Sequence, residues 1–248
     1  MAGTTVQDFR VGRVLATAWS VYMKNFVAFS AVSLVILLPL LVVQLTLIDP
    51  LPTDPATAPD DNQVADLIYT IFNILVTQLV TATLVYGTIQ EMRQQVTSTV
   101  EALTRGVQLA LPVVGIALIV GILVNVGMLL LIVPGVILYV MFWVAIPVAV
   151  VERPGVIASL QRSMFLTKGN RWRIVGILVI LWVVLIVVIL LLGAVFGSSQ
   201  STAVLVYANY VVTVLITVVL AVVSAVGYHD LRLLKDGVDV DRIAAVFD

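Results

Sequence analysis

The chain contains no cysteine and a single histidine, His229, among its 248 residues. The lack of cysteine excludes disulfides, thiolate metal sites and cysteine nucleophiles, and one histidine leaves almost no room for a histidine-based metal or proton-transfer site. Charge is also scarce, because Asp, Glu, Lys and Arg make up 11% of the residues and the formal net charge is −1. A globally basic nucleic-acid-binding protein is therefore not expected.

Apolar residues are correspondingly abundant, at 61% of the chain, and the mean hydropathy is +1.16. A soluble domain has about 45–50% apolar and about 25% charged residues, and intrinsic disorder requires low hydrophobicity with high net charge. The composition excludes both classes. It predicts an all-α integral membrane protein in which residues 1–248 form one polytopic membrane domain.

Six apolar stretches are long enough to cross about 30 Å of hydrocarbon as helices, which takes about 20 residues. They are residues 26–48, 64–90, 107–132, 136–151, 174–196 and 203–228. We interpret them as three hairpins, preceded by segment 1–25 and followed by a tail at 229–248. The fourth stretch is short, so the third and fourth either cross separately or form a re-entrant hairpin whose tip is Pro134-Gly135. We favour full crossing, because the two stretches together supply a long, largely apolar run.

The basic residues occupy alternate connecting segments. Three lie before the first span, two before the third, five before the fifth and three in the tail, which accounts for all 13 Lys and Arg residues. Segment 49–63 is instead rich in Asp and Pro. The positive-inside rule therefore places both termini in the cytoplasm. The apolar run at 26–48 is too long for the core of a cleaved signal peptide, which has about 7–15 residues.

Residues 8–25 have the pattern of an amphipathic helix, with polar side chains at intervals of three and four residues. Basic and aromatic side chains in this segment are suited to the membrane interface. The interfacial anchors predicted here are Arg10, Arg13, Trp19, Tyr22 and Lys24. Residues 98–108 and 155–168 are also predicted to form short interfacial helices, so that one such helix precedes each of spans one, three and five.

A second basic cluster precedes the fifth span, and it consists of Arg162, Lys168, Arg171 and Arg173 with the aromatic residue Trp172. Each Lys or Arg close to an anionic leaflet gains on the order of 1 kcal/mol. The cluster therefore predicts contact with anionic lipid headgroups. The alternative is that these residues determine topology only, as basic residues do in every membrane protein of this kind.

No span carries an ionisable residue well inside it, and neutral polar residues lie there instead. They form two helical faces, made of Asn73, Thr77 and Thr81 and of Asn209, Thr213 and Thr217. Such faces either line a polar path or hydrogen-bond between helices, and we favour packing. Nucleotide-binding loops, serine elbows and zinc-binding HExxH motifs are absent. The sequence thus predicts no catalytic residue, no metal and no cofactor, and a protein that is not an enzyme.

Two stretches carry a resemblance to a known group of proteins. The residues concerned are Pro134, Gly135, Glu152, Ser163 and Gly169 in the first stretch and Asp230 and Arg232 in the second. Their arrangement resembles bacterial YciC-type inner-membrane proteins and the membrane domain of glycerophosphoryl diester phosphodiesterases. The resemblance implies a six-helix protein of the bacterial inner membrane with a cytoplasmic C-terminus. It supplies no activity, because the catalytic barrel of those phosphodiesterases is a separate domain that this chain does not contain.

The motif residues have local interpretations as well. Gly169 is expected to end the helix at 155–168 with a positive φ, and Glu152 is expected to pair with Arg162 or Arg232. Asp230 and Arg232 would brace the inner ends of the helices.

The function predicted from these features is that of a non-enzymatic inner-membrane scaffold or accessory protein. It would bind membrane lipid, chiefly anionic, and act as a homo-oligomer or within a larger membrane complex. A channel or facilitator for a small neutral solute and a lipid-handling protein are the alternatives.

The charge partition predicts where introduced cysteines react. Because the chain has no native cysteine, Thr57→Cys and Ser199→Cys variants should react with an impermeant maleimide added outside intact cells. A Ser163→Cys variant should not react. The measurement is a gel shift of the purified protein, and labelling at Ser163 alone would overturn the orientation.

Overall fold

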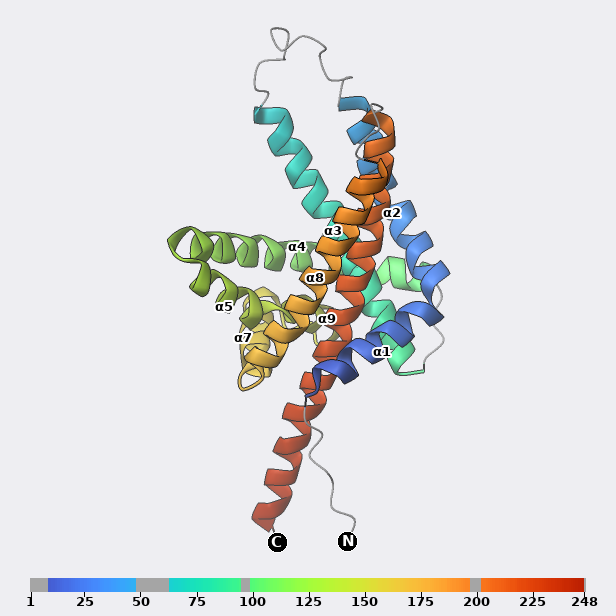
Figure 1. The fold of residues 1–248 in the computed structure, drawn as a ribbon. Helices are drawn as coiled ribbons and strands as arrows, with labels where there is room; N and C mark the ends of the chain where they lie inside the picture. Colours follow the sequence, from blue (N-terminus) through green and yellow to red (C-terminus); the bar gives the residue numbers. More distant parts are fainter. Residues whose placement is uncertain (1–8, 48–62, 95–98, 197–201, 248) are drawn as a thin grey trace.

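The computed structural model describes residues 9–47, 63–94, 99–196 and 202–247, and every regular element in these residues is a helix. In chain order the helices are α1 (Val11–Lys24), α2 (Phe26–Leu47), α3 (Gln63–Met92), α4 (Thr99–Leu130), α5 (Ile132–Phe142), α6 (Ala145–Val151), α7 (Val156–Thr167), α8 (Arg171–Phe196) and α9 (Thr202–Phe247). Figure 1 shows α2, α3, α8 and α9 rising together as a bundle, with α1 slanting across its lower part.

Six helical stretches of the described chain are long and apolar enough to cross a membrane, as the sequence predicts. They are Phe26–Leu45, Leu67–Met92, Val100–Leu130, Ile132–Val151, Arg171–Val195 and Val206–Gly237. In α2 and α8 only 17% of the span is buried inside the protein. Soluble monomers rarely expose apolar patches larger than a few hundred Å². The exposed apolar surface therefore faces hydrocarbon, and the chain is a multi-pass membrane protein.

Helix α9 lies at the centre of the packing and contacts α1, α2, α3, α6, α7 and α8. Its inward face is fully buried at Val218, Ala225 and Leu231. Small residues on this face let neighbours approach closely, as is usual where membrane helices pack. At Gly227 the indole of Trp143 lies so close that an added Cβ would be 2.4 Å from it. The helices that cover α9 are thus positioned by steric fit.

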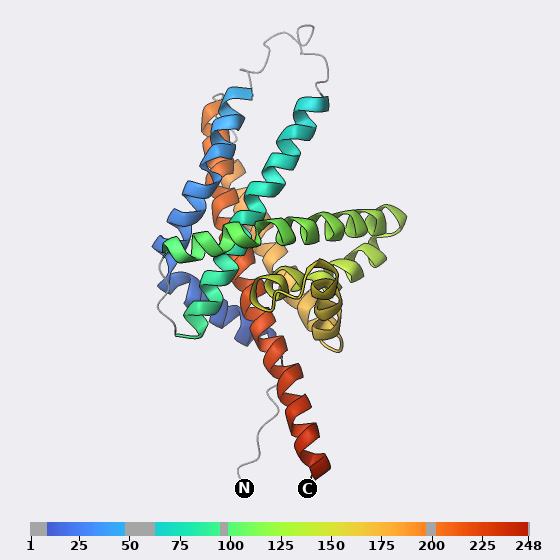
Figure 2. The same cartoon turned by 180° about the vertical axis from the view of Figure 1, so that it is seen from behind.

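Helices α4 and α5 form a tightly packed hairpin, which we name the arm. A Cβ on Gly135 would lie 2.7 Å from the backbone nitrogen of Met128, and one on Gly127 would lie 2.9 Å from the Cα of Gly135. Only glycine permits this distance between the two helices. Figures 1 and 2 show the arm running across the bundle and projecting from its side.

The sequence predicts the tip of this hairpin at Pro134-Gly135, a few residues after the place where the chain reverses. The chain reverses at Leu131, whose backbone is extended (φ −161°, ψ 143°), and α5 begins at Ile132. Pro134 lies in the first turn of α5, where a missing N–H costs no hydrogen bond. Gly135 serves the helix contact rather than the turn.

The predicted fourth span at 136–151 is two helices, α5 and α6, separated at Trp143 and Val144. Pro147 explains the break, because it has no N–H to donate to the carbonyl four residues earlier. The hydroxyl of Ser163 donates to the nearby Met141 carbonyl at 2.8 Å, and that of Thr167 does so at 3.4 Å. Helix α7 is therefore hydrogen-bonded to the place where the fourth span breaks.

Other expectations have mixed outcomes. The helices predicted at 8–25 and 155–168 are present as α1 and α7, and Gly169 has φ +89° as expected. The separate short helix at 98–108 is wrong, since those residues begin the continuous helix α4. The sixth span does not end at 228, because α9 continues to Phe247. The segments at 49–63, after the first predicted span, and at 197–202, before the sixth, fall almost wholly outside the described residues.

The close contact in the arm generates a stability test. We expect Gly135→Ala to destabilise the protein by about 1–3 kcal/mol, the usual cost of overpacking, because the backbone of Met128 stands in the way. Gly193→Ala is the matched control, since an added Cβ on Gly193 of α8 meets nothing within 4 Å. The measurement is the thermal unfolding midpoint in detergent micelles. Equal midpoints for the two variants would show that the arm tolerates a wider separation.

Candidate functional site

A cluster of charged and hydroxyl side chains joins α6, α7 and α9 at one end of the bundle. Arg162 of α7 lies between two carboxylates: its Nε donates to Glu152 at 3.1 Å and its Nη2 donates to Asp236 at 2.8 Å. Tyr228 of α9 donates its hydroxyl to Glu152 at 2.8 Å. We name these residues, with Arg232, the charge cluster. It confirms the expected pairing of Glu152 with Arg162.

Arg232 completes the cluster from the next turn of α9. Its Nε donates to Asp236 at 3.2 Å and lies 3.9 Å from Glu152. Burial lowers the pKa of the Arg162 guanidinium, but hydrogen bonds and charge attraction from Asp236 and Glu152 outweigh burial and raise that pKa above its usual value. Arg162 therefore stays charged, and its charge is balanced within the protein.

Helix α1 is held to the same end of the bundle by its polar stripe. Arg13 donates to Asp230 of α9 at 3.1 Å, and Lys24 forms an ion pair with Glu91 of α3. The apolar face is also turned to the protein, because Val14 and Ala18 are buried. The predicted anchors Arg13 and Lys24 thus pair with carboxylates of the same chain, although the Lys24 side chain is 72% exposed. Asp230 holds the first turn of α1 against α9. Arg10 and Trp19 are exposed on α1, whereas Tyr22 is buried.

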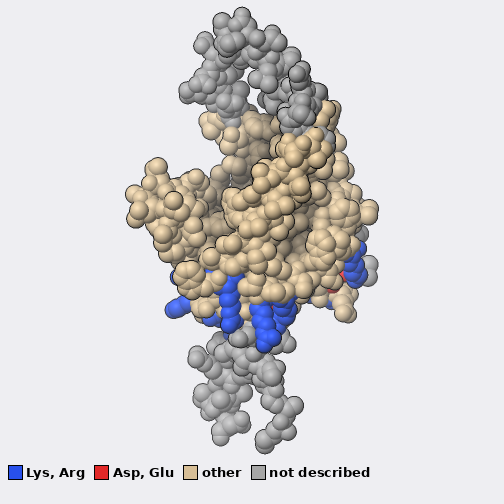
Figure 3. Space-filling view, viewed as in Figure 1, with Lys and Arg blue, Asp and Glu red and all other residues tan. Residues whose placement is uncertain are grey.

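The predicted headgroup cluster is divided by the structure. Arg162 belongs to the charge cluster, and Arg173 donates to the backbone carbonyl of Phe9 at 2.7 Å. Lys168 is exposed, Arg171 is half-buried and Trp172 is 86% exposed. Figure 3 shows Lys and Arg side chains gathered in a band below the apolar body. Lys168, Arg171 and Trp172 form what we name the basic patch.

Ser163 is fully buried. Absence of labelling at a cysteine in that position would therefore report burial as well as sidedness. The exposed Lys168 is the better position for a cysteine on that side of the membrane.

A cavity of about 460 Å³ lies in the angle between the arm and the bundle. Its walls come from α3, α4, α5, α6 and α9, and the polar residues among them are Thr77, Gln78, Thr81, Asn125, Tyr139, Thr217 and Ser224. The two polar faces predicted from the sequence thus meet in part, through Thr77, Thr81 and Thr217. The sequence did not single out Gln78, Asn125 or Ser224 as a group, because they lie on three different helices.

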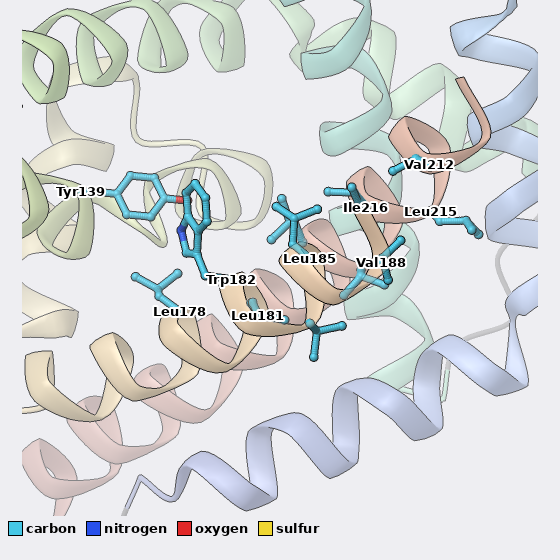
Figure 4. Close-up of a pocket in the computed structure, with 12 residues that line it drawn as sticks. Tyr139, Leu178, Leu181, Trp182, Leu185, Val188, Val212, Leu215 and Ile216 are labelled. Atoms are coloured by element: carbon cyan, nitrogen blue, oxygen red, sulfur yellow. The ribbon is translucent and has the colours of Figure 1, made fainter. Parts of the chain in front are cut away.

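An apolar groove of about 230 Å³ continues from this cavity between α8 and α9. Figure 4 shows Tyr139 and Trp182 side by side at one end and leucine, isoleucine and valine side chains along the rest. Tyr139 and Leu220 line both the polar cavity and the apolar groove. The two spaces are therefore neighbours with very different linings.

Comparison of the chain with protein-family models, curated proteins and solved structures finds no match. The resemblance noted from the sequence stays a prediction. Within the described residues no group of three or more His, Cys, Asp or Glu side chains is arranged to hold a metal ion.

The charge cluster can be tested by a double-mutant cycle with Glu152→Gln, Arg162→Gln and the double variant. We expect each single change to lower the free energy of unfolding by about 1–3 kcal/mol, because it leaves charged hydrogen-bond partners unpaired. The double variant should lose less free energy of unfolding than the two single variants lose together, and the difference, the coupling energy, should be about 0.5–3 kcal/mol. Unfolding in a detergent titration measures all three values.

Arg105→Gln is the matched control for this cycle. Arg105 donates a hydrogen bond to Gln108 of the same helix at 3.4 Å. Its replacement should therefore lower the free energy of unfolding by less than about 0.5 kcal/mol. Strict additivity of the Glu152 and Arg162 effects would mean that the two side chains do not stabilise each other.

Proposed function

We propose that the chain is a non-enzymatic scaffold or accessory protein of the bacterial inner membrane that binds anionic lipid at its cytoplasmic face. The observation that carries this proposal is the basic patch. Trp172 is 86% exposed at the start of an apolar span, directly beside Arg171 and close to the exposed Lys168. Trp is a residue that favours the membrane interface, and cations on this side attract anionic headgroups.

The proposed orientation places both termini in the cytoplasm. The concentration of Lys and Arg at one end of the apolar body supports it (Figure 3). The start of α1 and the end of α9 lie on that same side (Figure 1). In this orientation α1 and α7 lie at the cytoplasmic interface, consistent with the amphipathic patterns of their sequences.

The arm is proposed to be a re-entrant hairpin, which differs from the full crossing favoured by the sequence. It runs across α3 and α9 instead of alongside them in both views (Figures 1 and 2). Its tip exposes an unbroken apolar run, with Leu129 and Ile132 among the most exposed residues. At the turn Leu131 donates to the Gly127 carbonyl at 3.0 Å and accepts from the Gly135 N–H at 3.4 Å. The other backbone groups at the turn are tolerated inside hydrocarbon only where protein covers them. The outer surface of the arm would serve as the contact for a second copy or another membrane protein.

Removal of the two cations of the basic patch tests the lipid proposal. We expect the Lys168→Gln, Arg171→Gln double variant to bind phosphatidylglycerol about 30-fold more weakly, since each cation contributes about 1 kcal/mol, or about fivefold. The measurement is the ratio of phosphatidylglycerol to phosphatidylcholine retained on protein purified from mixed nanodiscs. High salt should reproduce part of the loss, because the charges are solvent-accessible.

The Arg93→Gln, Arg105→Gln double variant is the control, because it removes the same charge from the turn after α3 and the first part of α4. We expect it to retain phosphatidylglycerol. If both double variants retain the same lipid ratio as the unaltered chain, the basic residues determine topology and nothing more.

A further inference from the structure

The polar cavity between the arm and the bundle is lined by neutral hydrogen-bonding side chains. Two of its hydroxyl groups donate within their own helices: Thr81 donates to the Thr77 carbonyl at 2.9 Å and Ser224 donates to the Ala221 carbonyl at 2.9 Å. The side-chain amide of Asn125 likewise donates to the Gly121 carbonyl at 2.8 Å. The lone pairs of these side-chain oxygens are left for a ligand that can donate.

Gln78 adds an acceptor that has no partner. Its Oε1 atom is buried and forms no hydrogen bond within the described chain, although it belongs to the cavity wall. Buried polar atoms are nearly always hydrogen-bonded in native proteins, and each exception calls for a further partner or another explanation. A hydroxyl group of a ligand is a partner that satisfies this acceptor.

The cavity is unsuited to a charged headgroup. Its wall contains no Lys, Arg or His to bind a phosphate. Gln78 and Glu91 are thirteen residues apart on α3, which places the amide about 20 Å along the helix from the charged end. An ionic group at that depth in a bilayer is costly.

The adjoining apolar groove has the dimensions of a lipid chain. The α8 residues that line it run from Leu178 to Val188, a rise of about 15 Å. That length is about half of the 30 Å hydrocarbon core, and therefore close to the depth of one leaflet. Since Tyr139 and Leu220 line both spaces, a molecule with a small polar head and a long apolar chain fits both at once.

We propose that the cavity and groove together bind a lipid alcohol, meaning an uncharged lipid with a free hydroxyl group. The hydroxyl hydrogen-bonds with the neutral polar wall of the cavity, at Gln78, and the chain lies between α8 and α9. Diacylglycerol and polyprenols share this chemistry. The proposal rests on the proposed function for its membrane setting. It deepens that function by adding a second kind of lipid, which differs from the anionic lipid at the basic patch.

Photolabelling of the full chain in phosphatidylcholine nanodiscs tests the proposal. The probe is a diacylglycerol with a diazirine in one acyl chain, and mass spectrometry locates the labelled peptides. We expect labelling on α8 and α9 between residues 178 and 220. Unlabelled diacylglycerol or polyprenol should compete, and whichever competes at the lower concentration identifies the source of the alcohol. Phosphatidic acid with the same acyl chains should compete at least tenfold less well.

Two variants locate the site, and one serves as a matched control. Gln78→Leu should weaken competition by diacylglycerol about tenfold, the effect of one ordinary hydrogen bond. Gln44→Leu makes the same change in α2, outside the walls of both spaces, and should leave labelling unchanged. Leu185→Trp fills the groove without touching the polar wall and should abolish labelling there, so it carries the test if Gln78→Leu fails to fold.

Equal competition by phosphatidic acid, or equal labelling of the Gln78→Leu and Gln44→Leu proteins, would overturn the proposal and indicate ordinary bulk lipid. Phosphatidylglycerol retention is measured on the same unaltered protein in mixed nanodiscs. If the protein retains phosphatidylglycerol selectively but is not labelled by the diacylglycerol probe, the cavity proposal is overturned and the proposed function stands. Diacylglycerol labelling without phosphatidylglycerol selectivity would count against the proposed function alone.

Discussion

The hydrocarbon core of a bilayer contains no water that could hydrogen-bond to the backbone where a helix is interrupted, and the structure depends on this constraint. Backbone groups in hydrocarbon must be hydrogen-bonded within the protein, so an interruption needs a partner from elsewhere in the chain. At the break between α5 and α6 that partner is α7, whose Ser163 and Thr167 hydroxyls donate to the Met141 carbonyl. The same contact fixes α7 at the end of the bundle, and so it brings Arg162 to Glu152.

Charge is used sparingly and is balanced where it is partly buried. The guanidinium of Arg162 faces two carboxylates, and Tyr228 and Arg232 complete the bonds of Glu152. Such a cluster adds specificity more reliably than stability, because the desolvation of its charges offsets much of their attraction. In this chain it specifies how α6 and α7 lie against α9. The basic patch, by contrast, remains open to the surroundings of the protein.

Hydropathy in the sequence was enough to predict six helical stretches that are long and apolar enough to cross a membrane, and the position of Gly169 predicted the end of α7. The course of the arm was beyond such reasoning, because α4 beyond Gln108 is apolar apart from Asn125 and its pattern gives no direction for packing. Pro134-Gly135 reads as a turn until the contact of Gly135 with Met128 is known. Asp236 lies 74 residues from Arg162, and the cavity joins residues of five helices. Both depend on tertiary packing that no local pattern encodes.

Helix α9 links the two ends of this arrangement mechanically. It is a continuous helix of 46 residues, and it carries Thr217 in the cavity wall and Asp236 in the charge cluster. These residues are about 28 Å apart along a rod with 1.5 Å rise per residue. A tilt of about 5° about the charge cluster would shift Thr217 by about 2.5 Å at that rise, nearly the width of a water molecule. The cavity wall and the charge cluster therefore share one continuous helix, and a tilt of that helix would change the width of the cavity.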